Sequence, residues 1–237
     1  MKSNERYYKV ISWLFALTII VWGICSFCPN FFCRNKDKSQ IYKDALLSIV
    51  EVKAVTESVG ESFGTAEFVG DGKLITNAHV VTDKKLGETF AFDNIFIRFA
   101  SETDYHAVEI VKYDTDKDLA VLKSTDVSHD TLEIDRECDY KTGDEVYAIG
   151  NLNNIGISFT EGVISNKKIN VEHIGYTREV IQCDLTIAEG NSGGALLNKQ
   201  GQLIGITTFR LRDTSNNVIY GISYCIPANV VWEYISN

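Results

Sequence analysis

Short runs of apolar residues, separated by turn-forming residues, fill the chain from residue 47 onward. Such runs, bounded by Gly, Asn, Asp and Lys, predict β-strands. The first series of predicted strands covers residues 48–55, 64–69, 73–76, 94–99, 106–113 and 119–123. The second series covers residues 145–149, 158–164, 179–184, 202–208 and 221–226. Two groups of about six short strands, without helical patterns between them, predict an all-β fold of two six-stranded antiparallel barrels.

Helical patterns in the predicted domain occur only near its two ends. Residues 40–47 predict a helix that leads into the first barrel. Pro227 suits the first turn of a helix, and the segment 229–235 that follows it predicts a closing helix whose apolar side chains pack on the barrels.

A third apolar segment lies near the N-terminus and has a different pattern. Residues 10–27 carry no charged residue and are apolar on every face. As a helix they would extend roughly 27 Å, close to the thickness of a hydrocarbon core. We therefore predict a basic tail at residues 1–9, a transmembrane signal anchor at 10–28, a linker at 29–43 and one domain at 44–237.

The absence of a convincing small-residue cleavage site after this segment favours a retained anchor over a cleaved signal peptide, which is the alternative. Either form predicts a membrane-directed chain whose domain lies outside the cytoplasm. A buried helix of a soluble domain is disfavoured, because such a helix has one apolar stripe.

The charge distribution excludes one class of partner. The net charge is −9, but residues 1–43 contain seven Lys/Arg and two acidic residues, which leaves −14 for the remainder. An acidic domain without a basic cluster repels phosphate backbones, so we expect no nucleic-acid binding.

The six cysteines do not form a zinc pattern. Cys25, Cys28 and Cys33 follow the apolar segment and suit membrane-proximal thiols or a local disulfide, because no second pair stands at ligand spacing. The others, Cys138 among them, are scattered through the domain. We expect no metal and no organic cofactor.

The segment 188–195, Ala-Glu-Gly-Asn-Ser-Gly-Gly-Ala, is the strongest local motif. Glycines on both sides of Ser192 allow a sharp turn that leaves its hydroxyl and the neighbouring N–H groups free to face one bound atom. A nucleophile with an oxyanion hole needs this arrangement, although the same run alone also suits an ordinary turn.

Two further segments supply the partners of such a serine. His79 stands at the end of an apolar strand, in the sequence Thr-Asn-Ala-His-Val-Val, and Asp118 begins another strand, in Asp-Leu-Ala-Val-Leu-Lys. A serine hydroxyl becomes a strong nucleophile when a histidine takes its proton and a buried carboxylate orients that histidine.

The order of His79, Asp118 and Ser192, with these three motifs, resembles trypsin-like serine proteases, and most closely the HtrA/DegP group. The resemblance covers about residues 45–230. It implies that His79 is the general base, Asp118 its orienting partner and Ser192 the nucleophile, with the N–H groups of Gly190 and Ser192 as the oxyanion hole. It further implies hydrolysis of peptide bonds in unfolded or exposed polypeptides through an acyl-enzyme, and a homotrimer.

The substrate pocket is expected between two segments of the second barrel. The residues assigned to its walls are Thr186, Ile187, Ala188, Ile206, Thr207 and Thr208. None is charged, so we predict cleavage after small or medium aliphatic residues. Core packing is an equally good interpretation for Ile206.

Two features limit what the resemblance implies. Asn191 precedes the serine where zymogen-activated proteases carry an aspartate, so we expect no activation by N-terminal cleavage. Few residues follow the last strand, and no PDZ domain is expected.

A non-catalytic peptide-binding module on the same barrels is the alternative function, and an esterase is disfavoured because the G-x-S-x-G motif is missing.

Overall fold

The computed structural model describes Trp13 and residues 36–237, except 58–59, 86, 126–128, 174, 213–214 and 216. Six antiparallel strands form the first barrel in the order β1-β2-β3-β8-β7-β6, and β6 pairs with β1 to close it. These strands are β1 (Ile49–Thr56), β2 (Gly60–Gly70), β3 (Lys73–Thr76), β6 (Asn94–Phe99), β7 (His106–Asp114) and β8 (Leu119–Lys123).

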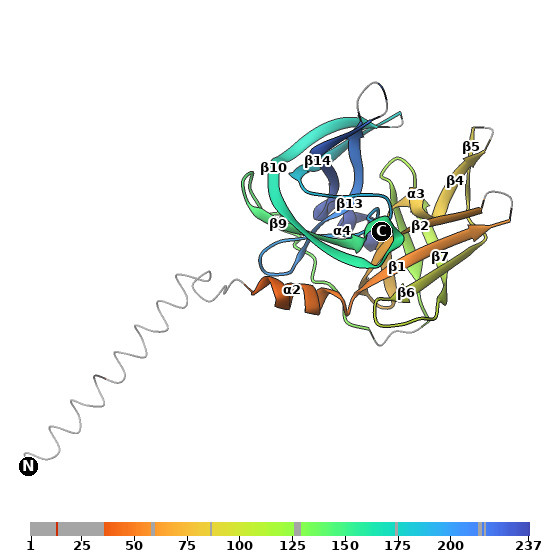
Figure 1. Ribbon diagram of the computed structural model, residues 1–237, viewed down its shortest axis with the longest axis horizontal. Helices are drawn as coiled ribbons and strands as arrows, with labels where there is room; N and C mark the ends of the chain where they lie inside the picture. The colour runs from red at the N-terminus through yellow and green to blue at the C-terminus, as the bar shows by residue number, and fades with distance from the viewer. Residues whose placement is uncertain are drawn as a thin grey trace, which may run out of the picture. The chain divides into compact units, whose positions relative to one another are not determined.

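The second sheet has the order β10-β11-β14-β13-β12-β9, and β9 pairs again with β10. Its strands are β9 (Glu145–Asn151), β10 (Ile157–His173), β11 (Tyr176–Asp184), β12 (Ala195–Leu197), β13 (Leu203–Arg212) and β14 (Val218–Pro227). Figure 1 shows this sheet, in green to blue, beside the orange-to-green first barrel. The all-β prediction is therefore confirmed.

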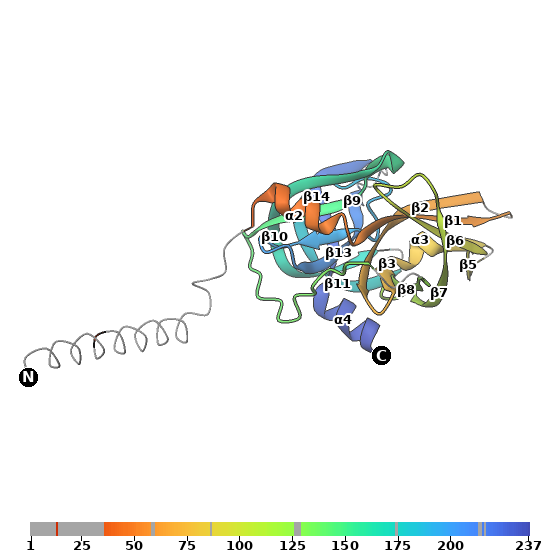
Figure 2. The ribbon, with the colours of Figure 1, turned by 90° about the horizontal axis from the view of Figure 1, so that it is seen from below.

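Short elements complete the two sheets. These are helix α2 (Lys38–Ala45), helix α3 (Ala78–Val81), the hairpin β4 (Thr82–Lys85) and β5 (Glu88–Ala91), the 3-10 turn η2 (Leu152–Asn154) and helix α4 (Ala228–Ser236). Figure 2 shows α4 leaving the end of β14 and carrying the C-terminus. Pro227 is the last residue of β14 and the N-cap of α4, one position earlier than the sequence pattern suggested.

Each barrel has its own apolar core, and a third cluster lies between them. The interior of the first barrel holds Phe68, Leu74 and their neighbours, and that of the second holds Ile181, Leu196 and theirs. The third cluster contains residues from both barrels, including Ile49, Ile75, Val121, Ile149 and Ile206. Because alternate residues of a strand face opposite sides, β-strand periodicity serves both kinds of core at once.

Glu67 on β2 breaks the apolar character of the inter-barrel cluster. It pairs in register with Ile49 and Ile75, so its side chain is on the same side of the sheet as theirs. It is completely buried, and neither carboxyl oxygen has a hydrogen-bond partner. Burial raises the pKa of Glu67 well above its ordinary value.

The sequence pattern missed three strands and underestimated the length of several others, most of all β10. The strands β4, β5 and β12 were not predicted, and β10 continues to His173 rather than ending near residue 164. Among the described residues, no helix is long and apolar enough to span a bilayer. Apart from Trp13, the predicted anchor at residues 10–28 lies outside the described residues, and so does the part of the linker at 29–35.

Candidate active site

His79 and Asp118 form a hydrogen-bonded pair at the edge of the first barrel. His79 lies in α3, directly after β3, and Asp118 immediately precedes β8, which pairs with β3. The Nδ1 atom of His79 is 2.9 Å from both Oδ1 and Oδ2 of Asp118, and its backbone N–H donates to Oδ1 at 3.1 Å. This arrangement places the Nδ1 proton toward the carboxylate and leaves Nε2 available as a base.

Asp118 is held in a backbone conformation that residues other than glycine seldom adopt. Its φ is +57°, in the left-handed region, which costs about 1–2 kcal/mol for a residue other than glycine. Asn77 Nδ2 donates to the Asp118 carbonyl oxygen at 2.9 Å, and Thr208 Oγ1 donates to Oδ2 at 2.7 Å. These contacts fix the direction of the carboxylate.

The pKa values of the pair follow from burial and charge. Burial disfavours ionised Asp118, but the charge and hydrogen bonds of His79 and the Thr208 hydroxyl outweigh it, so the pKa of Asp118 is lowered. Burial also lowers the pKa of His79, whereas Asp118 raises it and Arg178 lowers it, and the net result is a raised pKa. His79 therefore accepts a proton more readily than a free imidazole.

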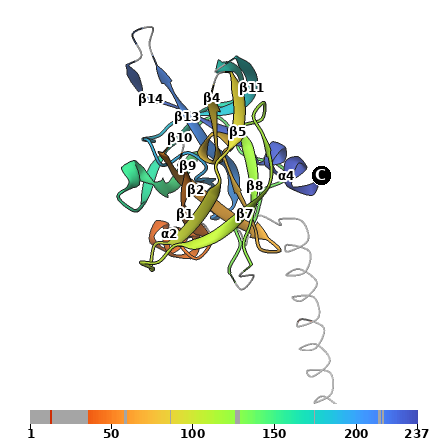
Figure 3. The ribbon, with the colours of Figure 1, turned by 90° about the vertical axis from the view of Figure 1, so that its right-hand side faces the viewer.

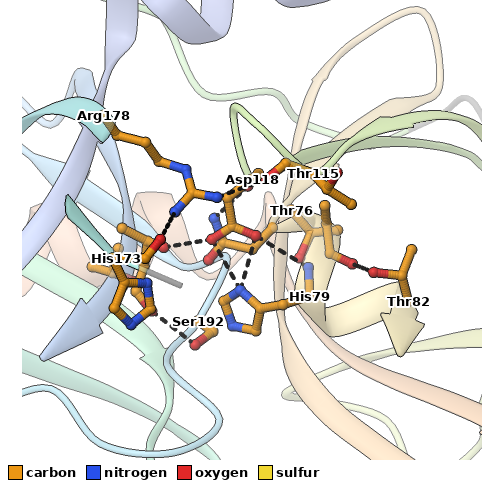
Figure 4. Close-up of polar contacts among 12 residues, drawn as sticks. Thr76, His79, Thr82, Thr115, Asp118, His173, Arg178 and Ser192 are labelled. Carbon is orange, nitrogen blue, oxygen red and sulfur yellow. Dashed lines mark hydrogen bonds and ion pairs between the residues drawn. The ribbon is translucent and has the colours of Figure 1, made fainter. Parts of the chain in front are cut away.

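Ser192 comes from the second barrel, in the loop between β11 and β12. Its Oγ donates to the carbonyl oxygen of Thr208 at 3.1 Å. Figure 4 shows Ser192 beside the edge of the His79 ring that faces away from Asp118. The three residues that the sequence motifs singled out, from three distant segments, are thus brought together at one site.

The glycines around Ser192 are required by close backbone contacts. Gly190 has φ +87°, and a Cβ atom there would overlap the carbonyl oxygen of Asn151. Gly193 has φ +81°, and a Cβ atom there would overlap the carbonyl oxygen of Thr65. Within the described residues, the N–H groups of Gly190 and Ser192 donate no hydrogen bond.

Thr65 of β2 joins this loop to the first barrel. Its Oγ1 donates to the Gly190 carbonyl oxygen at 2.8 Å and accepts the Asn151 N–H at 2.9 Å, and its own N–H donates to the Ser192 carbonyl oxygen at 2.9 Å. The Asn153 N–H holds the Glu189 carbonyl oxygen at 2.7 Å. The Glu189 carbonyl and the Gly190 N–H belong to the same trans peptide and point in opposite directions. The bond to Asn153 therefore directs the Gly190 N–H away from Asn153.

A cavity of about 320 Å³ lies beside this loop. Thr186, Ile187 and Ala188 line it, as the sequence analysis expected. Its walls also include Asp184 and Arg210, so the expectation of uncharged walls differs from the structure.

The other three expected wall residues lie elsewhere. Ile206 is completely buried in the inter-barrel cluster. Thr207 is also buried and donates to the Gly194 carbonyl oxygen at 3.1 Å, and Thr208 faces Asp118. These two threonines of β13 therefore hold the loop and the carboxylate rather than lining the cavity, whereas Arg210, farther along the same strand, does line it.

A second cavity, of about 270 Å³, opens on the other side of His79. It is lined by Lys84 of the β4–β5 hairpin and by His173, Tyr176 and Arg178 of the β10–β11 hairpin, along with His79 itself. Figure 3 shows β4, β5 and β11 at the same end of the molecule. Sequence reasoning did not single out these hairpin residues, because no motif marks them.

The described part of the chain contains no group of three or more His, Cys, Asp and Glu side chains placed to hold a metal ion. Cys138, Cys183 and Cys225 are free thiols.

Comparison with known proteins agrees with this geometry. A family model described as a trypsin-like peptidase domain matches residues 64–206. The serine endoprotease DegS of Haemophilus influenzae is 34% identical over 161 residues, which are 68% of this chain and 45% of that protein. Mitochondrial HTRA2 of Bos taurus is 32% identical, over 77% of this chain and 37% of its own length. The chain thus spans less than half the length of these relatives.

Solved structures show the same fold. The HtrA-type protease AlgW, solved with a tripeptide, superimposes with a TM-score of 0.70 at 29% identity, covering 85% of this chain and 63% of that one. The Rv3671c protease from M. tuberculosis gives a TM-score of 0.71 at 20% identity, covering 86% and 87%, and supports the fold.

Two antiparallel barrels with a histidine, an aspartate and a serine between them define the trypsin-like class, and the chain belongs to the trypsin-like peptidase domain family. Within that family it is similar to DegS and to HtrA-type structures, in keeping with the resemblance noted in the sequence.

Proposed function

We propose that this chain is a serine endopeptidase that hydrolyses peptide bonds in unfolded or exposed polypeptides. The observation that carries the proposal is the His79–Asp118 hydrogen-bonded pair beside Ser192. The free N–H groups of Gly190 and Ser192 support it, because they suit a developing negative charge.

In the acylation step, the Ser192 hydroxyl leaves its hydrogen bond to Thr208 and passes its proton to Nε2 of His79. The oxygen attacks the carbonyl carbon of the substrate, and the N–H groups of Gly190 and Ser192 bind the resulting oxyanion. The imidazolium, stabilised by ionised Asp118, then protonates the leaving amine, and the peptide bond breaks. Water attacks the acyl-enzyme by the same route in reverse, with His79 again as base.

Three observations support an intact triad over the non-catalytic binding module. Asp118 is buried and accepts three hydrogen bonds, Gly190 leaves its N–H free, and Thr65 fixes the loop that carries Ser192. A module that merely held a peptide would need none of these arrangements.

The test uses the full chain, purified with mild detergent because of its apolar N-terminal segment. We expect labelling by a fluorophosphonate and cleavage of unfolded casein, and we expect both to vanish in Ser192→Ala. Ser101→Ala is the matched control, because Ser101 is exposed on the first barrel. A folded protein that shows neither labelling nor cleavage would support the peptide-binding module.

We further propose that the cavity beside Ala188 accepts a small or medium aliphatic side chain on the amino side of the cut bond. Ile187 and Ala188 present apolar surface to it. Asp184 and Arg210 bring charges of opposite sign, so neither a basic nor an acidic substrate side chain would meet a net complementary charge. Sequencing the casein fragments tests this preference, and fragments ending in Lys, Arg, Asp or Glu would contradict it.

Residues 10–28 are proposed to anchor the chain in a membrane, with the domain on the extracytoplasmic side. The support is the uncharged segment itself and the names of relatives such as a DegP-like periplasmic endoprotease of Rhizobium meliloti. Digestion of intact and lysed spheroplasts with an added protease tests the orientation. The homotrimer that the resemblance implies is tested by light scattering on the purified chain.

A further inference from the structure

Arg178 on β11 makes an unusual set of contacts next to the proposed active site. Its side chain is largely buried, and its guanidinium donates from Nε to the Asp116 carbonyl oxygen at 2.7 Å and from Nη2 to the Thr115 carbonyl oxygen at 2.6 Å. A third hydrogen bond runs from Nη1 to the His173 carbonyl oxygen at 3.5 Å. Figure 4 shows the guanidinium between these groups.

These contacts cross from one barrel to the other. Arg178 belongs to the second barrel, whereas Thr115 and Asp116 lie in the turn of the first barrel that ends at Asp118. The planar guanidinium can grip two successive carbonyl groups at fixed angles, which an ammonium group cannot do. Arg178 therefore restrains the turn from one side, while Asn77 restrains the Asp118 carbonyl from the other.

The strained backbone of Asp118 makes this restraint consequential. A residue other than glycine keeps a positive φ when its surroundings hold it there. If the turn at Thr115 and Asp116 relaxed, the carboxylate of Asp118 would lose its alignment with Nδ1 of His79. The restraint on the turn thus acts on the base through its orienting partner.

The charge of Arg178 has a second effect. All three of its hydrogen-bond acceptors are neutral carbonyl oxygens, so its positive charge is not matched by a hydrogen-bonded carboxylate. That charge lowers the pKa of His79, against the larger raising effect of Asp118. Besides Asp118, the other charged or titratable groups around the same cavity are Asp83, Lys84, His173 and Tyr176.

We propose that Arg178 is a positioning residue for the proposed peptidase reaction: it clamps the turn before Asp118 so that the Asp118 carboxylate stays directed at His79. This inference rests on the proposed function. It means that a residue of the second barrel helps to hold the His79–Asp118 pair of the first barrel in place.

The kinetic test compares Arg178→Lys and Arg178→Gln with Arg136→Gln as control, since exposed Arg136 stacks on Trp232 instead. Both variants lose the paired hydrogen bonds from the guanidinium to the Thr115 and Asp116 carbonyl oxygens. We therefore expect kcat to fall roughly 10- to 100-fold in both, with KM little changed. In Arg178→Lys, which keeps the charge, misalignment of Asp118 weakens its raising effect on the pKa of His79, so the acid limb of the kcat/KM profile moves to lower pH. In Arg178→Gln the loss of the charge opposes this shift, and the acid limb lies at higher pH than in Arg178→Lys.

A second measurement does not depend on turnover. In a Ser192→Ala background, histidine ¹⁵N NMR follows the titration of His79; the pKa of His79 falls on Arg178→Lys and is higher in Arg178→Gln than in Arg178→Lys. If the wild-type chain hydrolyses no peptide, the proposed function fails while this arm still decides the role of Arg178. Circular dichroism establishes that each variant is folded, and Arg178→Lys serves where Arg178→Gln does not fold.

An Arg178→Lys protein with wild-type kcat/KM and an unshifted His79 titration would overturn the proposal. A fall in kcat that merely tracks the fraction of unfolded protein, without movement of the acid limb or of the His79 titration, would overturn it as well.

Discussion

Glu67→Gln is expected to change the pH dependence of folding. Glu67 is completely buried between the barrels without a hydrogen-bond partner, and burial raises its pKa well above the ordinary value. In the unfolded chain the same carboxyl titrates at about 4.3. Between these two values the folded state holds one proton that the unfolded state has released.

The sign follows from this difference in bound protons. A raised folded-state pKa stabilises the protein fully below the unfolded-state pKa, and the stabilisation is lost as the pH rises toward the folded-state pKa. One proton corresponds to a loss of about 1.4 kcal/mol in unfolding free energy per pH unit. Over two pH units inside that window, the wild-type chain therefore loses about 2.7 kcal/mol that a glutamine at this position cannot lose.

The assay is urea unfolding followed by circular dichroism at several pH values from 5 upward, in a Ser192→Ala background that prevents self-cleavage. The difference in unfolding free energy between Glu67→Gln and its parent is plotted against pH. Glu109→Gln is the control, because Glu109 is exposed on β7. Parallel curves for the parent and Glu67→Gln would refute the reasoning, since they would mean that Glu67 ionises equally in both states.

Four further expectations concern the site itself. Thr208→Val removes a hydrogen bond to the Asp118 carboxylate and is expected to lower kcat/KM roughly 10- to 100-fold, measured with a casein peptide. Thr65→Val leaves the Gly190 carbonyl oxygen and the Asn151 N–H without their hydrogen bonds to Thr65 and lowers the unfolding free energy by about 1–3 kcal/mol. Thr65→Ser, which keeps the hydroxyl, restores that free energy. Gly190→Ala displaces one oxyanion donor and lowers kcat roughly 100- to 1,000-fold; it also lowers the unfolding free energy, because its Cβ atom would overlap the Asn151 carbonyl oxygen. Because the pKa of His79 is raised and its neutral form is the base, the midpoint of the acid limb of kcat/KM lies above 6.5.

Each of these expectations has a result that contradicts it. Unchanged kcat/KM in Thr208→Val would mean that the Asp118 carboxylate needs no hydroxyl to hold it. Equal unfolding curves for Thr65→Val and the wild type would remove Thr65 from the support of the loop. Wild-type turnover in Gly190→Ala, or an acid limb below pH 6.5, would contradict the assigned geometry of the oxyanion donor and of His79.

Much of the fold could be predicted because short apolar runs bounded by turn-forming residues are a local signal. Strand β8, with four consecutive buried residues from Leu119 to Leu122, is an example. Strand β12 gave no such signal, since it has only three residues and follows two glycines. The outer part of β10, rich in Asn and Lys, pairs with β11 mainly through backbone hydrogen bonds, which leave no trace in the apolar pattern.

The candidate site was predictable where short motifs carry it and unpredictable where contacts are long-range. His79, Asp118 and Ser192 each stand in a recognisable local sequence. Arg178 lies 60 positions from Asp118 and bonds backbone carbonyls, so no motif could link them. The prediction that Thr207 and Thr208 line the cavity was wrong for the same reason. The register of β13 makes these residues face the loop and the carboxylate, and register is a long-range property.

The distribution of the site over the two barrels has a consequence for chain cleavage. His79 and Asp118 precede the connection between β8 and β9, and Ser192 with Gly190 follows it. A cut in that connection would separate the molecule into one fragment with a base but no nucleophile and another with a nucleophile but no base. In a mixture of the two fragments, only barrel pairs that have reassembled would hydrolyse a substrate. The rate of hydrolysis would then measure the association of the two barrels directly.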